Sequence, residues 1–313
     1  MLKFDKMKIV ANVEDIEITD ETKFKAESQD GVIKTLTYQQ KKPYSLSIEV
    51  RYDVGEVVIE FTGKVLGAKY PRLISEETIK DCFEAINNIG FCRLDPEAMM
   101  EADVVKCDVT QDVKMQDMPE VVKFIKGNLI SYHQYSCRIL RPGTLVLEKN
   151  VVTNRNKRRL TLYDKEREMK MAQNREYVIS NDLDGKYEGI CRFELNLNTK
   201  KQIREELEIS NTKLKNVLSS TAKPISKFIS EAVIDDVSGT PSDGWKSYWQ
   251  RLVLKDCGYD LERVEAKLRQ YKSARNARIS KFMAPFRELL QVEEESPCNI
   301  SKQEILNRLN VSN

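Results

Sequence analysis

Apolar and polar residues alternate along short segments through roughly the first 200 residues of the chain. Clear examples are residues 6–13, 44–52 and 56–61, with the sequences KMKIVANV, YSLSIEVRY and EVVIEF. A period of two is typical of strands with one covered face and one polar face. The pattern therefore predicts a sheet built mainly from antiparallel strands.

Two helices are expected to interrupt these strands. Residues 74–90 carry Ser75 as a candidate N-cap, acidic residues in the first turn and Gly90 as the end signal. Residues 118–128 have Pro119 in the first turn and a glycine near the end. Both helices should pack an apolar face against the sheet.

Beyond residue 200 the apolar period changes to 3.6, which predicts helices at 201–218 and 226–234. The loop DDVSGTPSDG follows at 235–244 and indicates a domain boundary. Three or four further helices are expected after it. One contains Trp249, and the last opens with a capping box at Ser301.

The sequence thus predicts an α+β fold with a largely antiparallel central sheet and flanking helices, followed by a helical C-terminal domain. We place one unit at residues 1–200, connecting helices at 201–235 and the helical domain, a candidate binding domain, at 236–313.

Composition describes a polar globular protein, because 32% of the residues are charged and 41% are apolar. The net charge of +2 does not identify a partner. No stretch approaches the ~18 apolar residues of a membrane span, and the first residues lack the apolar core of a signal peptide. We therefore expect a cytoplasmic protein without a membrane partner.

His133 is the only histidine, which excludes metal sites built from several histidines. The seven cysteines never form the close pairs of a zinc or redox site, so reduced thiols are expected. A phosphate-binding Walker loop is also missing, because Val58 stands where its first glycine is required. Any metal should therefore be held mainly by carboxylates.

Three further segments are predicted to place ionisable side chains on the polar face of a strand. In residues 103–112, Val105, Cys107 and Val109 should face one way and Asp108 and Asp112 the other. Two carboxylates thus share one face.

Residues 158–169 should bring Tyr163 and Lys165 to one strand face, with Glu168 just beyond. Residues 190–198 should turn Arg192, Glu194 and Asn196 to their polar face. The simplest interpretation is an ordinary antiparallel sheet with a solvated face.

The same residue types also suit phosphoryl transfer. A tyrosine hydroxyl is a weak nucleophile at neutral pH and needs a cation beside it, which Lys165 can supply. An all-oxygen site for a divalent ion favours Mg²⁺ or Mn²⁺ and can polarise a phosphate.

The order of these motifs, KCDVTQD, then LYDKEREM, then RFELNLN, resembles the rolling-circle replication initiators of filamentous phages and related plasmids, the II/X replication protein family. The family's nucleophile motif is matched by Tyr163, Lys165 and Glu168, and its acidic strand at Asp108. Its arginine, aromatic, glutamate strand is matched at residues 192–194. The segment EFTGKVLG, around Lys64, is similar to a loop upstream of these motifs.

The resemblance implies an endonuclease that nicks one strand of an origin through Tyr163, with Lys165 assisting. It forms a 5′-phosphotyrosine bond, leaves a 3′ hydroxyl primer and later rejoins the displaced strand. The matched positions imply that Mg²⁺ or Mn²⁺ is held by Asp108, Glu168 and Glu194, with Asp112 as an alternative ligand. A host helicase is an implied partner.

Basic residues cluster without acids in two segments, 149–160 and 267–281, which suits contact with DNA phosphates. A solvated surface is the alternative for both. The residues we assign to DNA binding are Arg155, Lys157, Arg158, Arg159, Arg192, Lys272, Arg275 and Arg278.

Two other functions fit the same residues. A relaxase of a mobile element would use the same chemistry for conjugal transfer. A DNA-binding protein without catalysis would use the charged face only to hold phosphates. Phage replication and plasmid replication are equally compatible with the sequence.

Overall fold

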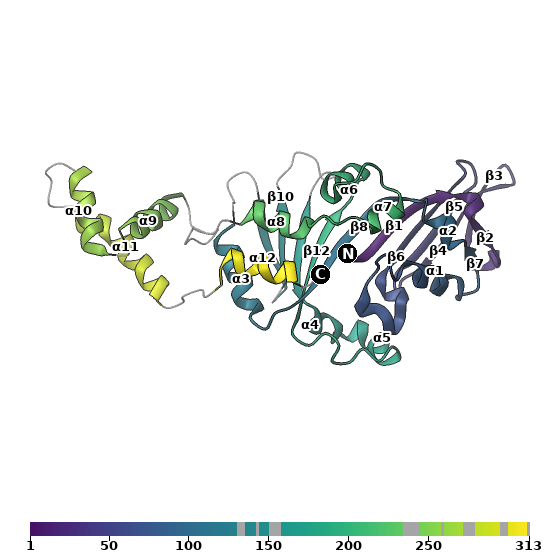
Figure 1. Ribbon diagram of the computed structural model, residues 1–313, viewed down its shortest axis with the longest axis horizontal. Coiled ribbons are helices and arrows are strands. Elements are labelled where there is room, and N and C mark those ends of the chain that lie inside the picture. Colours follow the sequence, from purple (N-terminus) through teal and green to yellow (C-terminus); the bar gives the residue numbers. More distant parts are fainter. Residues whose placement is uncertain are drawn as a thin grey trace.

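The described chain folds as an α+β protein whose main element is an antiparallel sheet of ten strands (Figure 1). The predicted fold class is confirmed at this level. The computed structural model describes residues 1–129, 135–141, 144–149, 158–233, 245–257, 260–271, 279–294 and 300–311.

The strand order of the sheet is β3-β4-β5-β6-β1-β8-β12-β11-β10-β9, so the three motif-bearing strands β8, β12 and β11 lie side by side. The bounds are β1 Phe4–Asn12, β3 Lys25–Gln29, β4 Val32–Gln40, β5 Leu46–Arg51, β6 Glu56–Thr62, β8 Asp103–Lys114, β9 Tyr135–Arg141, β10 Thr144–Lys149, β11 Arg159–Asp164 and β12 Ile190–Leu197. A separate pair is formed by β2 Ile16–Ile18 and β7 Cys92–Leu94.

Helices cover one face of the sheet and enclose the main apolar core. Alternate strand residues such as Met7, Ile9 and Phe193 point into this core and are completely buried. The helices with residues in this core are α1 Ile79–Asn87, α2 Pro96–Met99, α3 Met118–Gly127, α6 Lys200–Leu207, α7 Leu214–Leu218, α8 Pro224–Ala232 and α12 Lys302–Val311.

The opposite face carries the polar residues of the same strands, and it is covered only in part. A second, smaller apolar cluster lies over it and is centred on Tyr70, Tyr177 and Tyr187. Its elements are η3 Gly63–Arg72, α4 Lys165–Met169 and α5 Arg175–Ser180, with η5 Ala172–Asn174 between the last two. Two short 3₁₀ turns elsewhere are η1 Val13–Asp15 and η2 Glu21–Lys23.

A glycine shapes the segment η3. Gly67 has a φ of 57° and divides η3 at a kink. This backbone conformation strains any residue with a side chain, and a Cβ atom there would lie 2.7 Å from Oδ1 of Asn181, which would have to move.

The local expectations at Ser75 and Val105 differ from the structure. The first helix begins at Ile79 and not next to Ser75, because the Thr78 hydroxyl binds the Leu73 carbonyl at 2.6 Å and accepts from the Ser75 amide at 2.9 Å. Val105 is only half-buried, since a register shift in the β1–β8 pairing turns Val104 into the core in its place. Gly90 ends the first helix region as expected, with a φ of 92°.

The helices after residue 244 belong to two different cores. Helices α9 Trp245–Asp256, α10 Leu261–Tyr271 and α11 Ile279–Glu294 pack on one another at one end of the molecule (Figure 1). The last helix, α12, packs instead on α8 and β8 and adds Ile305 and Leu309 to the main core. Its predicted cap is confirmed, because the Glu304 amide donates to the Ser301 hydroxyl at 3.1 Å.

Two further features concern the cysteines and the lengths of the helices. The six cysteines in the described ranges carry free thiols. In the same ranges, none of the helices combines the length and the apolar character that crossing a membrane requires.

The position of α12 generates a stability prediction. Leu309 is completely buried, whereas Val311 on the same helix is 84% exposed. We expect Leu309→Ala to lower the free energy of unfolding by about 2–5 kcal/mol and Val311→Ala to change it by less than about 0.5 kcal/mol, measured by urea denaturation. Equal effects of the two variants would show that α12 is not part of the main core.

Candidate active site

The pairing of the three central strands places the motif residues in rows across the sheet. Tyr163 on β11 pairs with Arg192 on β12, and Arg192 pairs with Asp112 on β8. In the next row Glu194 pairs with Thr110, and in the row after that Asn196 pairs with Asp108. Because alternate residues share a face, these rows form one polar surface, as the sequence predicts.

Tyr163 and Glu194 form a hydrogen-bonded pair on this surface. The Tyr163 hydroxyl donates to Oε1 of Glu194 at 2.6 Å, and both residues are half-buried. Burial and the nearby charge of Asp5 raise the pKa of Glu194 to about 7. Burial and the charge of Glu194 hold the pKa of Tyr163 well above its usual value.

Lys165 reaches the same surface from a helix and not from the strand that the alternation predicts. Strand β11 ends at Asp164, whose carboxylate accepts from the Arg167 amide at 2.9 Å and caps helix α4. The Lys165 ammonium is buried, 2.7 Å from Oε2 of Glu168 and 5.6 Å from the centre of the Tyr163 ring.

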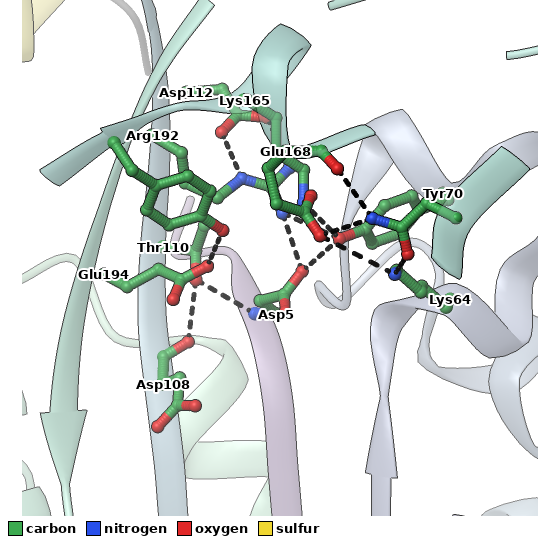
Figure 2. Close-up of polar contacts among 12 residues, drawn as sticks. Asp5, Lys64, Tyr70, Asp108, Thr110, Asp112, Lys165, Glu168, Arg192 and Glu194 are labelled. Carbon is green, nitrogen blue, oxygen red and sulfur yellow. Dashed lines mark hydrogen bonds and ion pairs between the residues drawn. The ribbon is translucent and has the colours of Figure 1, made fainter. Parts of the chain in front are cut away.

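Arg192 is completely buried, so it has no surface that could touch DNA. Its guanidinium donates two hydrogen bonds to Asp112, at 2.6 and 2.7 Å, and one to Asp5 at 2.7 Å (Figure 2). The structure therefore gives Arg192 an internal role, as the counter-ion of two carboxylates from neighbouring strands.

Tyr70 joins these charges, and sequence reasoning missed it. Its hydroxyl donates to Asp5 at 2.7 Å and accepts from Lys165 and from Arg192, each at 2.9 Å. Burial keeps the pKa of Tyr70 well above its usual value, so it is a neutral link between the charged groups. Figure 2 shows Tyr70 and Asp5 close to Lys165 and Arg192.

Lys64 and Asn174 complete the surroundings of Glu168. The Asn174 amide donates to Oε1 of Glu168 at 2.8 Å, and Lys64 donates to Asn174 at 2.9 Å. Burial alone would raise the pKa of Glu168, but the charges of Lys165 and Lys64 outweigh it and lower the pKa. In the sequence, Lys64 was marked only by the similarity of the segment EFTGKVLG to a loop upstream of the motifs. Nothing in the sequence marked Asn174.

The three predicted metal ligands do not converge in this structure. Glu168 is bound by Lys165 and Asn174, and Asp108 accepts from the Asn196 amide at 2.7 Å. Among the described residues, no group of three or more His, Cys, Asp or Glu side chains is arranged to hold a metal ion. Burial raises the pKa of Asp108, and the opposing charges of Lys106 and Lys6 do not offset this effect.

Besides Arg192, the structure describes two of the residues assigned to DNA binding. Arg158 is buried and pairs with Glu206 at 2.6 Å and with Glu231 at 2.8 Å. The side chain of Arg159 is 47% exposed and pairs with Glu148. Arg155, Lys157, Lys272, Arg275 and Arg278 lie outside the described residues, as does His133.

Comparison with known proteins identifies no relative of this chain. The chain matches no protein-family model, no curated protein and no solved structure. The assignment of a function therefore depends on the chemistry of the surface around Tyr163.

The Tyr163–Glu194 pair generates a pH prediction. The folded protein holds a proton on Glu194 up to about pH 7, whereas an unfolded glutamate loses it near 4.5, so this group lowers stability as pH rises between these values. Glu194→Gln removes that loss. We expect the variant to gain on the order of 1–3 kcal/mol relative to wild type between pH 5 and pH 8, measured by urea denaturation.

The control for this prediction is Glu188→Gln, which changes an exposed glutamate. Its stability relative to wild type should be independent of pH. A pH-independent difference for Glu194→Gln as well would contradict the raised pKa.

Proposed function

We propose that this chain nicks one strand of DNA with Tyr163 as the nucleophile and later rejoins the strand. The observation that carries the proposal is the 2.6 Å hydrogen bond from the half-buried Tyr163 hydroxyl to Glu194. A phenol that is partly open to solvent and bound to a carboxylate has both the nucleophile and the base of a transesterification.

The reaction balances with these two groups. Glu194 takes the phenolic proton as the Tyr163 oxygen attacks the phosphorus atom, and the bond from phosphorus to the 3′ oxygen breaks. The 5′ end stays linked to Tyr163, and the departing 3′ oxygen takes back the proton that Glu194 accepted, directly or through water, and becomes a hydroxyl. A pKa of about 7 suits Glu194 to this proton transfer at neutral pH.

Positive charge around the tyrosine supports the same chemistry. The Lys165 ammonium lies near the ring of Tyr163, and the Lys64 ammonium lies 4.0 Å from Oε1 of Glu168. Fixed cations in a buried setting stabilise a phenolate and the charge that develops on phosphate. Because Lys165 is held by Tyr70 and Glu168, its position is set before substrate binds.

We further propose that Mg²⁺ or Mn²⁺ assists the reaction by polarising the scissile phosphate. Asp108 fits this role best, because it is a half-buried carboxylate with a raised pKa and Glu194 already serves as the base. A cation beside Asp108 would favour its ionised form. Glu168 fits less well, since Lys165 already neutralises it.

The polar face of the sheet suits the approach of DNA. Lys6 and Lys8 on β1 and Lys106 on β8 are half-buried on this face, and Lys6 pairs across the strands with Asp108. A DNA strand whose phosphates bind these lysines would run across the sheet towards Tyr163. A replication initiator of this kind would work in the cytoplasm with a host helicase, in a phage or a plasmid system.

The main alternative is a DNA-binding protein without catalysis. The dense bonding of Lys165 and Arg192 would serve stability alone in that case. A relaxase would share the proposed chemistry and differ in its partner.

A test of the nucleophile compares two tyrosines. We expect Tyr163→Phe to abolish the nicking of supercoiled origin DNA and the formation of a DNA-linked protein, because the attacking oxygen is lost. DNA binding should stay within a few fold. Tyr52→Phe, at an exposed tyrosine in a turn, should leave both activities unchanged. Persistent adduct in Tyr163→Phe would refute the assignment.

A test of the metal uses the carboxylates. Excess EDTA should stop single-turnover cleavage, and Asp108→Asn should weaken Mn²⁺ binding by about 10-fold or more, since one charged ligand is lost. Asp53→Asn, at an exposed turn, should leave Mn²⁺ affinity unchanged. Full cleavage in EDTA, or equal Mn²⁺ affinity of both variants, would exclude this metal site.

A further inference from the structure

A pocket of about 430 Å³ opens between α4, α5 and the turn before β12. None of the residues that line it has a role in the reaction proposed above. Residues of all three segments line it, among them Met169, Arg175, Ile179, Leu183 and Tyr187.

The pocket has an apolar floor. Met169, Leu183 and Tyr187 are buried there, as members of the second apolar cluster. At its edge Ile179 is 70% exposed and extends the apolar surface of the pocket towards solvent. The volume falls in the range of pockets that hold small organic molecules, about 300–1,000 Å³.

The rim of the pocket is charged. Lys170 pairs with Glu166 at 2.5 Å, so its charge is balanced. Arg175 is exposed and forms no ion pair with any residue in the described ranges. A guanidinium in this position is suited to a phosphate, which it can hold by two parallel hydrogen bonds.

The pocket shares a wall with the candidate active site. The ring centre of Tyr187 lies 5.7 Å from the Lys165 ammonium and 5.8 Å from the Arg192 guanidinium. The same Lys165 ammonium lies 5.6 Å from the ring centre of Tyr163, so both rings pack around one charge. Within the described residues the buried Tyr187 hydroxyl has no hydrogen-bond partner.

Helix α4 lies between the pocket and the candidate active site and contributes residues to both. Lys165 and Glu168 point from it into the ion network, whereas Glu166, Met169 and Lys170 line the pocket. A molecule bound in the pocket therefore lies against the helix that holds the lysine beside Tyr163.

We propose that this pocket binds one nucleotide of the substrate strand, next to the phosphate that Tyr163 attacks. The base lies on the apolar floor formed by Met169, Leu183 and Tyr187, and a phosphate of the strand binds Arg175. The identity of the strand as substrate rests on the proposed function. Binding of a nucleotide to the pocket does not depend on catalysis.

Nucleotide chemistry matches each part of the pocket. Unstacked bases in single strands are bound by aromatic and apolar side chains, which replace the neighbouring bases. Acidic side chains at the rim, Glu166 and Asp184, can accept hydrogen bonds from exocyclic amino groups. A nucleotide held in this way would fix the register of the strand relative to Tyr163.

The test measures the binding of dAMP and dTMP to the full chain by calorimetry or ligand-observed NMR. We expect Arg175→Ala and Ile179→Glu to weaken binding about 10-fold, a loss of about 1.4 kcal/mol. Lys186→Ala is the matched control, because Lys186 is an exposed cation close to the pocket that does not line it. Its affinity should equal that of wild type.

Two results would overturn the inference. One is no binding of either nucleotide up to about 10 mM, and the other is equal affinity in Arg175→Ala and Lys186→Ala.

A parallel experiment separates this inference from the proposed function. Tyr163→Phe should bind dAMP as wild type does, because Tyr163 does not line the pocket. Nucleotide binding in a wild-type chain that forms no DNA adduct would refute the proposed function and support the pocket. Adduct formation without nucleotide binding would refute the pocket alone.

Discussion

The ion pairs of Arg192 determine how the site is built. A completely buried guanidinium costs several kcal/mol unless carboxylates neutralise it, and here Asp112 and Asp5 do so. These two residues come from β8 and β1, so one charge ties three strands together. Tyr70 extends the same bonding to η3, and through Lys165 to α4. Loss of either carboxylate would leave the charge of Arg192 only partly balanced.

Because Arg192 must be neutralised where it is buried, one sheet face carries both structural and reactive polar groups. Arg192 and Tyr70 are completely buried, and Asp112, whose side chain is 20% exposed, is held by two hydrogen bonds from Arg192. Tyr163 and Glu194 stand next to them, are half-buried and bond mainly to each other. The network thus fixes Lys165 near the reactive pair without exposing it. Groups held rigidly in this way need no reorganisation during reaction.

Local patterns in the sequence predicted the parts that local physics decides. Alternation predicted the strands and the face of Glu194, and the capping residues predicted the start of α12 at Ser301. The burial of Arg192 was not predictable, because it depends on Asp5, nearly 190 residues away in the chain. Tyr70, Asn174 and the pocket beside Tyr187 were missed for the same reason. Lys165 was assigned to a strand because alternation continues past the point where Asp164 caps a helix.

The central claim is that Tyr163 forms a covalent bond to DNA. The most direct measurement traps the protein with single-stranded origin DNA and Mn²⁺, digests the DNA and the protein, and locates the remaining nucleotide by mass spectrometry. Trypsin should release residues 160–165, LTLYDK, in which Tyr163 is the one tyrosine. We expect the nucleotide mass on this peptide. A nucleotide on a peptide that contains Tyr135 or Tyr187, or no nucleotide on any tyrosine, would contradict it.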